Sequence, residues 1–121
     1  MENKKTLVIG ASAKPERYSN MAINSLRRHN HTVVALAKRA GKVGDVDIQT
    51  KFPEKEDIHT VTMYVGAERQ PEYYQALLEL KPERVIFNPG AENFELADML
   101  EMTGIETIEG CTLVMLNTGQ Y

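Results

Sequence analysis

The chain has 121 residues, which suits one domain and leaves no room for two separate hydrophobic cores. Its net charge of -3 and isoelectric point near 5.6 argue against nonspecific binding to nucleic acid or an anionic membrane, because both depend on dense positive charge. A single cysteine, Cys111, excludes an intramolecular disulfide and a four-cysteine metal site.

The amino-terminal residues indicate a cytoplasmic protein. Residues 1–5 are polar and lead into an apolar run of about five residues, too short for a signal sequence or a membrane span. The single cysteine also fits a reducing compartment. We therefore expect one cytoplasmic domain over residues 1–121.

The first elements are a strand and a helix. Residues 6–9 form a short, β-branched apolar run that ends at Gly10, which predicts a strand buried on both faces. Between residues 19 and 28, apolar side chains recur at helical spacing. This pattern predicts a helix capped by Ser19 or Asn20.

Two more strands follow, with an ambiguous segment between them. Residues 32–37 and 60–65 have the β-branched and apolar content of strands. In residues 38–57, an edge strand is favoured by Val43, Val46 and Ile48, and a loop by Gly41, Gly44 and Asp45. The sequence leaves both alternatives open.

The second half repeats the alternation of helix and strand. Pro71 suits the first turn of a helix over residues 71–81, and residues 84–87 predict a strand. A helix over residues 93–103 follows, which Asn93 caps and Gly104 ends in a left-handed conformation. Residues 105–108 predict a last strand, and residues 112–116 are either a strand or a helical turn.

Strands separated by helical segments of this length pair in parallel through right-handed crossovers. The sequence therefore predicts an α/β protein with a three-layer Rossmann-like fold. We expect a mostly parallel sheet of about five strands with helices on both faces.

The loop between the first strand and the first helix has the composition of an anion site. In open α/β sheets, ligands bind beyond the carboxyl ends of the strands, near helix N-termini. Short side chains, free amides, hydroxyls and cations would together bind a phosphate. The predicted site residues here are Gly10, Ala11, Ser12, Ala13, Lys14, Arg17, Tyr18 and Ser19. The alternative is a simple turn, because G-x-G-x-x-G is absent.

The end of the second strand indicates which nucleotide binds. A dinucleotide site for NAD carries a carboxylate there for the ribose hydroxyls, whereas this chain has Lys38 and Arg39. Two cations suit a ribose that bears its own phosphate, as in NADP or coenzyme A. The alternative is a solvated pair of charges.

Two further segments are expected to complete the pocket. In the loop after the fourth strand, Pro89 and Gly90 set a tight turn, and Asn88 is placed to bind a ribose, amide or base. The alternative is a turn followed by a helix cap. An apolar wall for an adenine is expected from Tyr64, Val65 and Gly66, whereas Tyr73 and Tyr74 are assigned to packing.

The sequence contains no recognisable catalytic set. His29 and His31 flank the end of the first helix, where solvated or dipole-stabilised histidines are ordinary, and His59 has no evident carboxylate partner. No metal-ligand spacing is present, and Cys111 is more typical of a buried thiol than of a nucleophile. A binding module explains the chain better than an enzyme does.

Four motifs together resemble the CoA-binding domain family. They are VIGAS at residues 8–12, P-x-RYS at 15–19, NPGAEN at 88–93, and GIE at 104–106 leading to GCTLVM at 110–115. The chain is similar over nearly its whole length to the N-terminal domain of the succinyl-CoA synthetase α subunit and to its small stand-alone relatives.

The resemblance implies a five-stranded Rossmann-like sheet that holds the ADP part of coenzyme A against the first loop. Lys38 or Arg39 and residues 88–90 would complete the pocket. The synthetases react through a phosphohistidine on a second domain, so acyl-phosphate transfer is not expected here.

We therefore expect a module that binds coenzyme A or acyl-CoA and works as a carrier or sensor. Its partners would be this nucleotide and a protein or a second copy of the chain, with no nucleic acid or membrane. The alternatives are an NADP-binding sensor or redox module and a ligand-free interaction domain.

Overall fold

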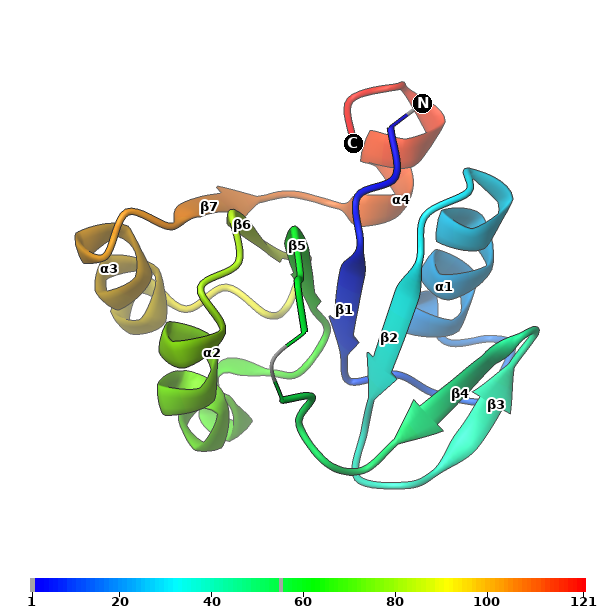
Figure 1. The fold of residues 1–121 in the computed structure, drawn as a ribbon, viewed down its shortest axis with the longest axis horizontal. Helices are drawn as coiled ribbons and strands as arrows, with labels where there is room; N and C mark the ends of the chain where they lie inside the picture. The colour runs from blue at the N-terminus through cyan, green and yellow to red at the C-terminus, as the bar shows by residue number, and fades with distance from the viewer. Residues whose placement is uncertain (1, 55) are drawn as a thin grey trace.

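The computed structural model describes residues 2–54 and 56–121, which form one seven-stranded sheet flanked by helices (Figure 1). The strand order is β3-β4-β2-β1-β5-β6-β7. Five of the six strand pairings are parallel, and only β3 and β4 pair antiparallel within the described chain. The strands are β1 (Thr6–Ile9), β2 (Val33–Leu36), β3 (Gly41–Val43), β4 (Val46–Gln49), β5 (Thr60–Met63), β6 (Arg84–Phe87) and β7 (Glu106–Glu109).

Three α-helices and two short 3₁₀ turns of the described chain connect strands, and a fourth α-helix follows the last strand. The α-helices are α1 (Tyr18–Arg28), α2 (Tyr74–Leu80), α3 (Phe94–Met102) and α4 (Thr112–Asn117), and the 3₁₀ turns are η1 (Ala67–Arg69) and η2 (Pro71–Tyr73). No helix of the described ranges is long and apolar enough to cross a membrane.

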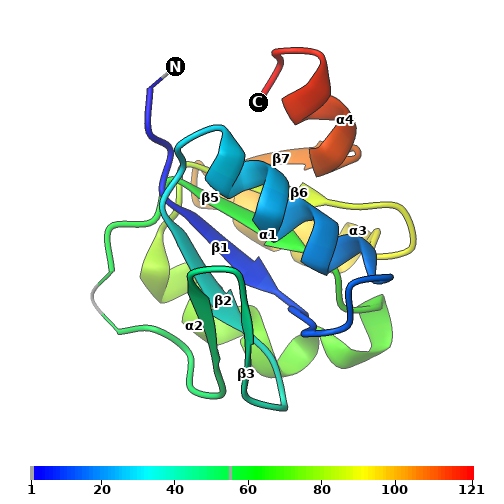
Figure 2. The same ribbon diagram turned by 90° about the vertical axis from the view of Figure 1, so that its right-hand side faces the viewer.

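Alternate residues of the central strands face two separate cores. Leu7 and Ile9 of β1 join the core under α2 and α3, whereas Val8 joins the core under α1 and α4. Figures 1 and 2 show these helices on opposite sides of the sheet. This arrangement confirms the predicted three-layer Rossmann-like fold with helices on both faces. Strands that are buried on both faces are largely apolar, without the alternation of polar residues found where one face of a sheet meets solvent.

The predicted number of strands is too low. The ambiguous segment after β2 forms a hairpin of β3 and β4, in which Gly44 turns with a φ of +58°. Val43, Val46 and Ile48 are buried in the core under α1, so the apolar alternation outweighs the turn signals except at the turn itself. The carboxyl-terminal segment, left open between a strand and a helical turn, is the helix α4.

The helix ends differ in part from expectation. The N-cap of α1 is Arg17, and Ser19 and Asn20 lie buried in the first turn, so the predicted caps of this helix are wrong. Asn93 does cap α3, since its Oδ1 accepts a bond of 3.1 Å from the Leu96 amide, and Gly104 ends that helix with a φ of +87°.

Candidate functional site

Gly10 makes the sharp turn from β1 into the following loop. Its φ is +94°, a conformation that residues with a side chain rarely adopt. A Cβ here would lie 3.0 Å from Val65 Cγ2 and 3.2 Å from the backbone carbon of Tyr64. Both the backbone conformation and the close approach of the β5 end therefore require glycine.

The free amides of the loop come from α1 rather than from the end of β1. The amides of Gly10 and Ala11 donate to the Leu36 carbonyl at 2.9 and 3.1 Å, so the expectation that they are free is wrong. The first three amides of α1 have no intrahelical acceptor, and none is found for them within residues 2–54 and 56–121. Ser12 is held in place as its carbonyl accepts a bond of 2.9 Å from the Asn20 side chain.

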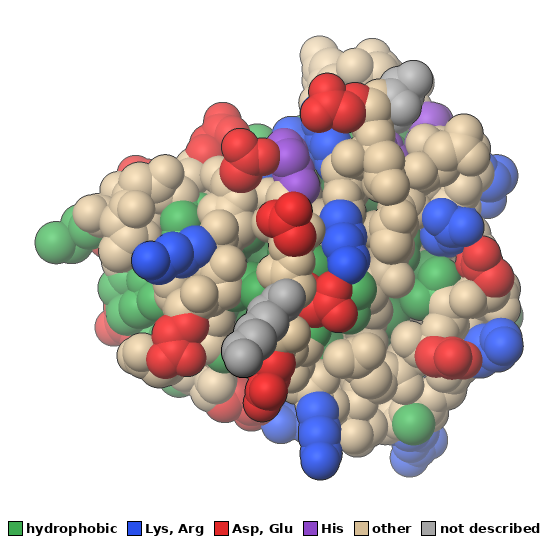
Figure 3. All heavy atoms as spheres, viewed as in Figure 1, with side chains coloured by type: hydrophobic (Ala, Val, Ile, Leu, Met, Phe, Trp, Pro, Cys, Tyr) green, Lys and Arg blue, Asp and Glu red, His purple; other side chains and the backbone are tan. Residues whose placement is uncertain are grey.

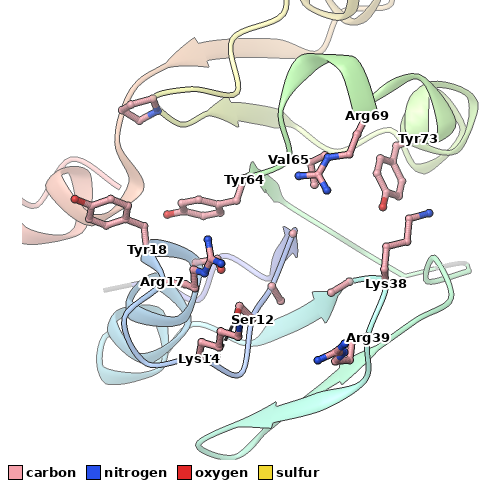
Figure 4. Close-up of a pocket in the computed structure, with 15 residues that line it drawn as sticks. Ser12, Lys14, Arg17, Tyr18, Lys38, Arg39, Tyr64, Val65, Arg69 and Tyr73 are labelled. Atoms are coloured by element: carbon pink, nitrogen blue, oxygen red, sulfur yellow. Dashed lines mark hydrogen bonds between the residues drawn. The ribbon is translucent and has the colours of Figure 1, made fainter.

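A pocket with a volume of about 640 Å³ opens beyond the carboxyl ends of β1, β2 and β5 (Figure 4). The chain leaves β1 toward β2 on one side and later adds β5 on the other, so the pocket lies at the point where the strand order reverses. Its lining is Gly10, Ala11, Ser12, Lys14, Arg17, Tyr18, Ser19, Ala37, Lys38, Arg39, Tyr64, Val65, Arg69, Tyr73 and Pro89.

The charged side chains of this lining are all cations. They are Lys14, Arg17, Lys38, Arg39 and Arg69, and no carboxylate of the described chain lines the pocket. On the face shown in Figure 3, by contrast, charges of both signs are interspersed. A protein with a net charge of -3 therefore has a local positive site, which is suited to an anion.

Lys38 is engaged at one wall of the pocket. Its ammonium forms an ion pair with Glu72, which raises the pKa of Lys38 and lowers that of Glu72, chiefly through the hydrogen bond between them. The same ammonium lies 6.0 Å from the ring centroid of Tyr73. The segment after β2 and the turn before α2 are thus in contact at one end of the pocket, where Figure 4 shows Lys38 next to Tyr73.

Asn88 lies behind the pocket rather than in its lining. The side chain is 2% exposed, and its amide nitrogen donates to Thr62 Oγ1 at 2.7 Å and to the Met63 carbonyl at 2.9 Å. Its Oδ1 accepts a bond of 2.9 Å from the Thr112 amide. In this conformation Asn88 fastens β5, β6 and the start of α4 together instead of facing a ligand.

Two other predicted residues also lie outside the lining. Ala13 packs against the start of β3, where a Cβ on Gly41 would lie 3.2 Å from the Ala13 Cβ. Gly90 donates its amide to Glu92 Oε1 at 2.9 Å, and Pro89 is the residue of this loop that reaches the pocket. The remaining predicted site residues come together as the sequence suggested.

Tyr64 lines the pocket with its ring and buries its hydroxyl. That oxygen has no hydrogen-bond partner among the residues described, although the nearby Thr62 and Thr112 hydroxyls partly offset the effect of burial. Burial raises the pKa of Tyr64 to about 12, so the phenol is neutral at physiological pH. It therefore supplies an aromatic surface to the pocket.

Val65 lines the pocket as expected, whereas sequence reasoning missed Ala37, Arg69 and Tyr73 of the lining. Arg69 belongs to η1, which follows the third predicted strand, so the rule that ligands bind beyond strand ends points to its loop. Tyr73 was assigned to packing; it is 9% exposed, belongs to the core under α2 and also borders the pocket.

His31 and His59 also differ from expectation. His31 is fully buried, and its Nδ1 accepts a bond of 2.9 Å from the Lys4 amide, so it is not solvated. His59 does have a carboxylate partner, Glu83, at 2.9 Å. Both lie at the opposite end of the sheet from the pocket, near the amino ends of β2 and β5, and are not part of it.

Fold and pocket define a doubly wound α/β domain with a ligand-sized, cationic pocket at its topological switch point. The chain belongs to the CoA binding domain family, whose model matches residues 4–117.

Several solved structures share this fold. The chain is 41% identical to a protein of known crystal structure described as uncharacterized, with a TM-score of 0.96 and 100% of both chains covered. It shares its fold with a hypothetical protein from Pyrococcus horikoshii OT3, at 21% identity and a TM-score of 0.87, covering 96% of this chain and 83% of that one. A structure from Thermus thermophilus has a TM-score of 0.85 at 18% identity, covering 98% and 91%. No curated protein matches the chain.

Proposed function

We propose that this protein is a nucleotide-binding module that holds coenzyme A or an acyl-CoA in the pocket beyond β1, β2 and β5. The proposal rests mainly on the composition of the pocket. Its described lining contains five cations and no carboxylate, and the amides at the start of α1 have no acceptor among the described residues. Membership of the CoA binding domain family supports the same ligand.

The residues present fit the charges of coenzyme A. Its diphosphate would lie against the first turn of α1, where free amides and the positive end of the helix dipole favour an anion. Lys14 and Arg17 would add charge-assisted contacts from the same loop. Lys38 and Arg39 would bind the 3′-phosphate on the ribose, across the pocket from Arg69.

The shape of the pocket also fits a ligand larger than a phosphate. Its volume of about 640 Å³ lies within the usual range for small-molecule sites. Tyr18 and Tyr64 lie at the other end of the pocket from Lys38 and Arg39 in Figure 4 and offer aromatic surface to a base or to the pantetheine arm. The module would then present the ligand to a partner, either another protein or a second copy.

Thermal denaturation with a panel of nucleotides tests this proposal. Coenzyme A at a hundredfold excess over its Kd should raise the free energy of unfolding by about 2.7 kcal/mol, a rise in Tm of about 10 °C. Binding of 3′-dephospho-CoA should be about tenfold weaker, or 1.4 kcal/mol. NADPH and ATP complete the panel.

Variants locate the ribose phosphate. Arg39→Ala should lose most of the preference for coenzyme A over 3′-dephospho-CoA, whereas Arg28→Ala should keep it. Arg28 is a matched control because it removes the same charge from the opposite end of α1. Stabilisation by NADPH without competition from coenzyme A would favour the NADP alternative. No response to any of these nucleotides would favour the ligand-free interaction domain.

A further inference from the structure

The ion pair between Lys38 and Glu72 occupies the place where the proposed function needs a free cation. Lys38 follows β2 and lines the pocket, whereas Glu72 belongs to η2, next to the lining residue Tyr73, and lies outside the lining itself. The pair is open to solvent, with 75% of the Lys38 side chain and 46% of the Glu72 side chain exposed. An incoming anion can therefore reach both groups.

Apart from Glu72, the surroundings of Lys38 in the pocket are an aromatic ring and other cations. The Tyr73 ring lies 6.0 Å from its ammonium and stabilises positive charge there. Arg39 and Arg69 also line this end of the pocket, and neither forms an ion pair within the described ranges. Glu72 is thus the group that neutralises Lys38 in the free protein.

We propose that Glu72 limits the affinity for the ligand's ribose phosphate by competing with that phosphate for Lys38. This inference rests on the proposed function. In the free protein the pair is formed at the edge of the pocket, and a terminal phosphate, with its higher charge and with Arg39 beside it, replaces the carboxylate at Lys38. A ligand without that phosphate leaves the pair closed and gains nothing from Lys38.

The selectivity follows from the charges. A phosphate monoester carries close to two negative charges at neutral pH and accepts several hydrogen bonds, whereas Glu72 carries one charge. The exchange therefore favours a ribose phosphate over ribose hydroxyls. Because exposed ion pairs are weak, removing the competition should tighten coenzyme A binding only about two- to fivefold.

The test is calorimetric titration of Glu72→Gln with coenzyme A and with 3′-dephospho-CoA. We expect a two- to fivefold lower Kd for coenzyme A and no specific change for 3′-dephospho-CoA. Glu68→Gln is the matched control, because Glu68 is an exposed carboxylate in η1 and makes no ion pair in the described chain. It raises the local charge equally without freeing Lys38.

Four results would overturn the inference. If Glu72→Gln and Glu68→Gln tighten coenzyme A equally, the effect is long-range charge. If Glu72→Gln weakens both ligands, Glu72 binds the ribose hydroxyls instead of competing with a phosphate. If the unaltered protein and Glu72→Gln bind coenzyme A with the same Kd, the ion pair does not compete with the ligand. The proposed function then remains without this inference. Absence of coenzyme A binding in the unaltered protein would overturn both.

Discussion

Replacing Gly10 with alanine is expected to lower the free energy of unfolding by about 2–5 kcal/mol. The first contribution is conformational, since a φ of +94° costs a residue with a Cβ about 1–2 kcal/mol. The second is steric, because the new methyl would lie 3.0 Å from Val65 Cγ2 and 3.2 Å from the Tyr64 backbone carbon. Overpacking of this kind costs about 1–3 kcal/mol.

Gly90 separates these two contributions. Its φ is +93°, nearly the value at Gly10, but a Cβ there would meet nothing within 4 Å. Gly90→Ala should therefore lose only the conformational part, about 1–2 kcal/mol. Urea denaturation followed by far-ultraviolet circular dichroism measures both variants under the same conditions.

The difference between the two alanine variants is the decisive quantity. We expect Gly10→Ala to be less stable than Gly90→Ala by about 1–3 kcal/mol, because Val65 and Tyr64 are held by the sheet and Val65 is β-branched. Equal losses would show that the ends of β1 and β5 are not in close contact. The close approach in the pocket floor would then be refuted.

Three further outcomes are expected. Asn88→Ala should cost about 2–4 kcal/mol in urea denaturation, because it leaves the buried Thr112 amide without its acceptor. Tyr64→Phe should leave stability at neutral pH unchanged or raise it by up to about 1 kcal/mol, since the hydroxyl has no partner among the described residues. His31 should titrate below its ordinary pKa of 6.5 in an NMR titration, because burial disfavours its imidazolium and the positive charge of Lys4 adds to the effect.

The pH dependence of the last two has opposite signs. The folded pKa of Tyr64 is raised to about 12, so its stabilising contribution is present below pH 10 and is lost between pH 10 and 12. Tyr64→Phe should lack that loss. The folded pKa of His31 is lowered, so its contribution is present above pH 6.5 and is lost as the pH falls. A His31 titration at or above 6.5 would contradict the burial argument.

Asn24→Ala is the control for the Asn88 variant. Asn24 is half-buried, and its amide donates to one other side chain, that of Asn20, at 3.1 Å. Its removal should cost less than about 1 kcal/mol. Similar losses for the two variants would mean that the network behind the pocket contributes no more than an ordinary side-chain hydrogen bond.

The layers of the fold could be predicted because local patterns determine them. The run at residues 6–9 and the spacing within residues 19–28 each follow from the burial of one element against the sheet. The hairpin of β3 and β4 was uncertain because its glycines signal turns while its valines signal strands, and only the core under α1 decides between them. The predicted caps of α1 are wrong because the helix begins earlier, at Tyr18 after Arg17, and the Asn20 side chain donates to the Ser12 carbonyl instead of capping the helix.

The parts of the candidate site that lie within one short segment could be predicted from the sequence. The contacts that the fold makes between distant segments could not. The loop after β1 and the cations after β2 are visible in the sequence. The ion pair of Lys38 joins residues 34 positions apart, and the partners of Asn88 come from β5 and α4. No local pattern contains such pairings, so the sequence does not reveal that the Asn88 side chain bonds to β5 and α4.

The two outermost strands bear on how copies of the molecule can meet. β3 has only three residues and carries Lys42, while β7 has Glu106 and Glu109 at its ends. Short margins with charged side chains discourage addition of a foreign strand, the usual route to fibrils. Joining copies through a continuous sheet is therefore disfavoured at both edge strands. Copies of the molecule would instead associate through their helical surfaces, and added strands would not cover the rim of the pocket.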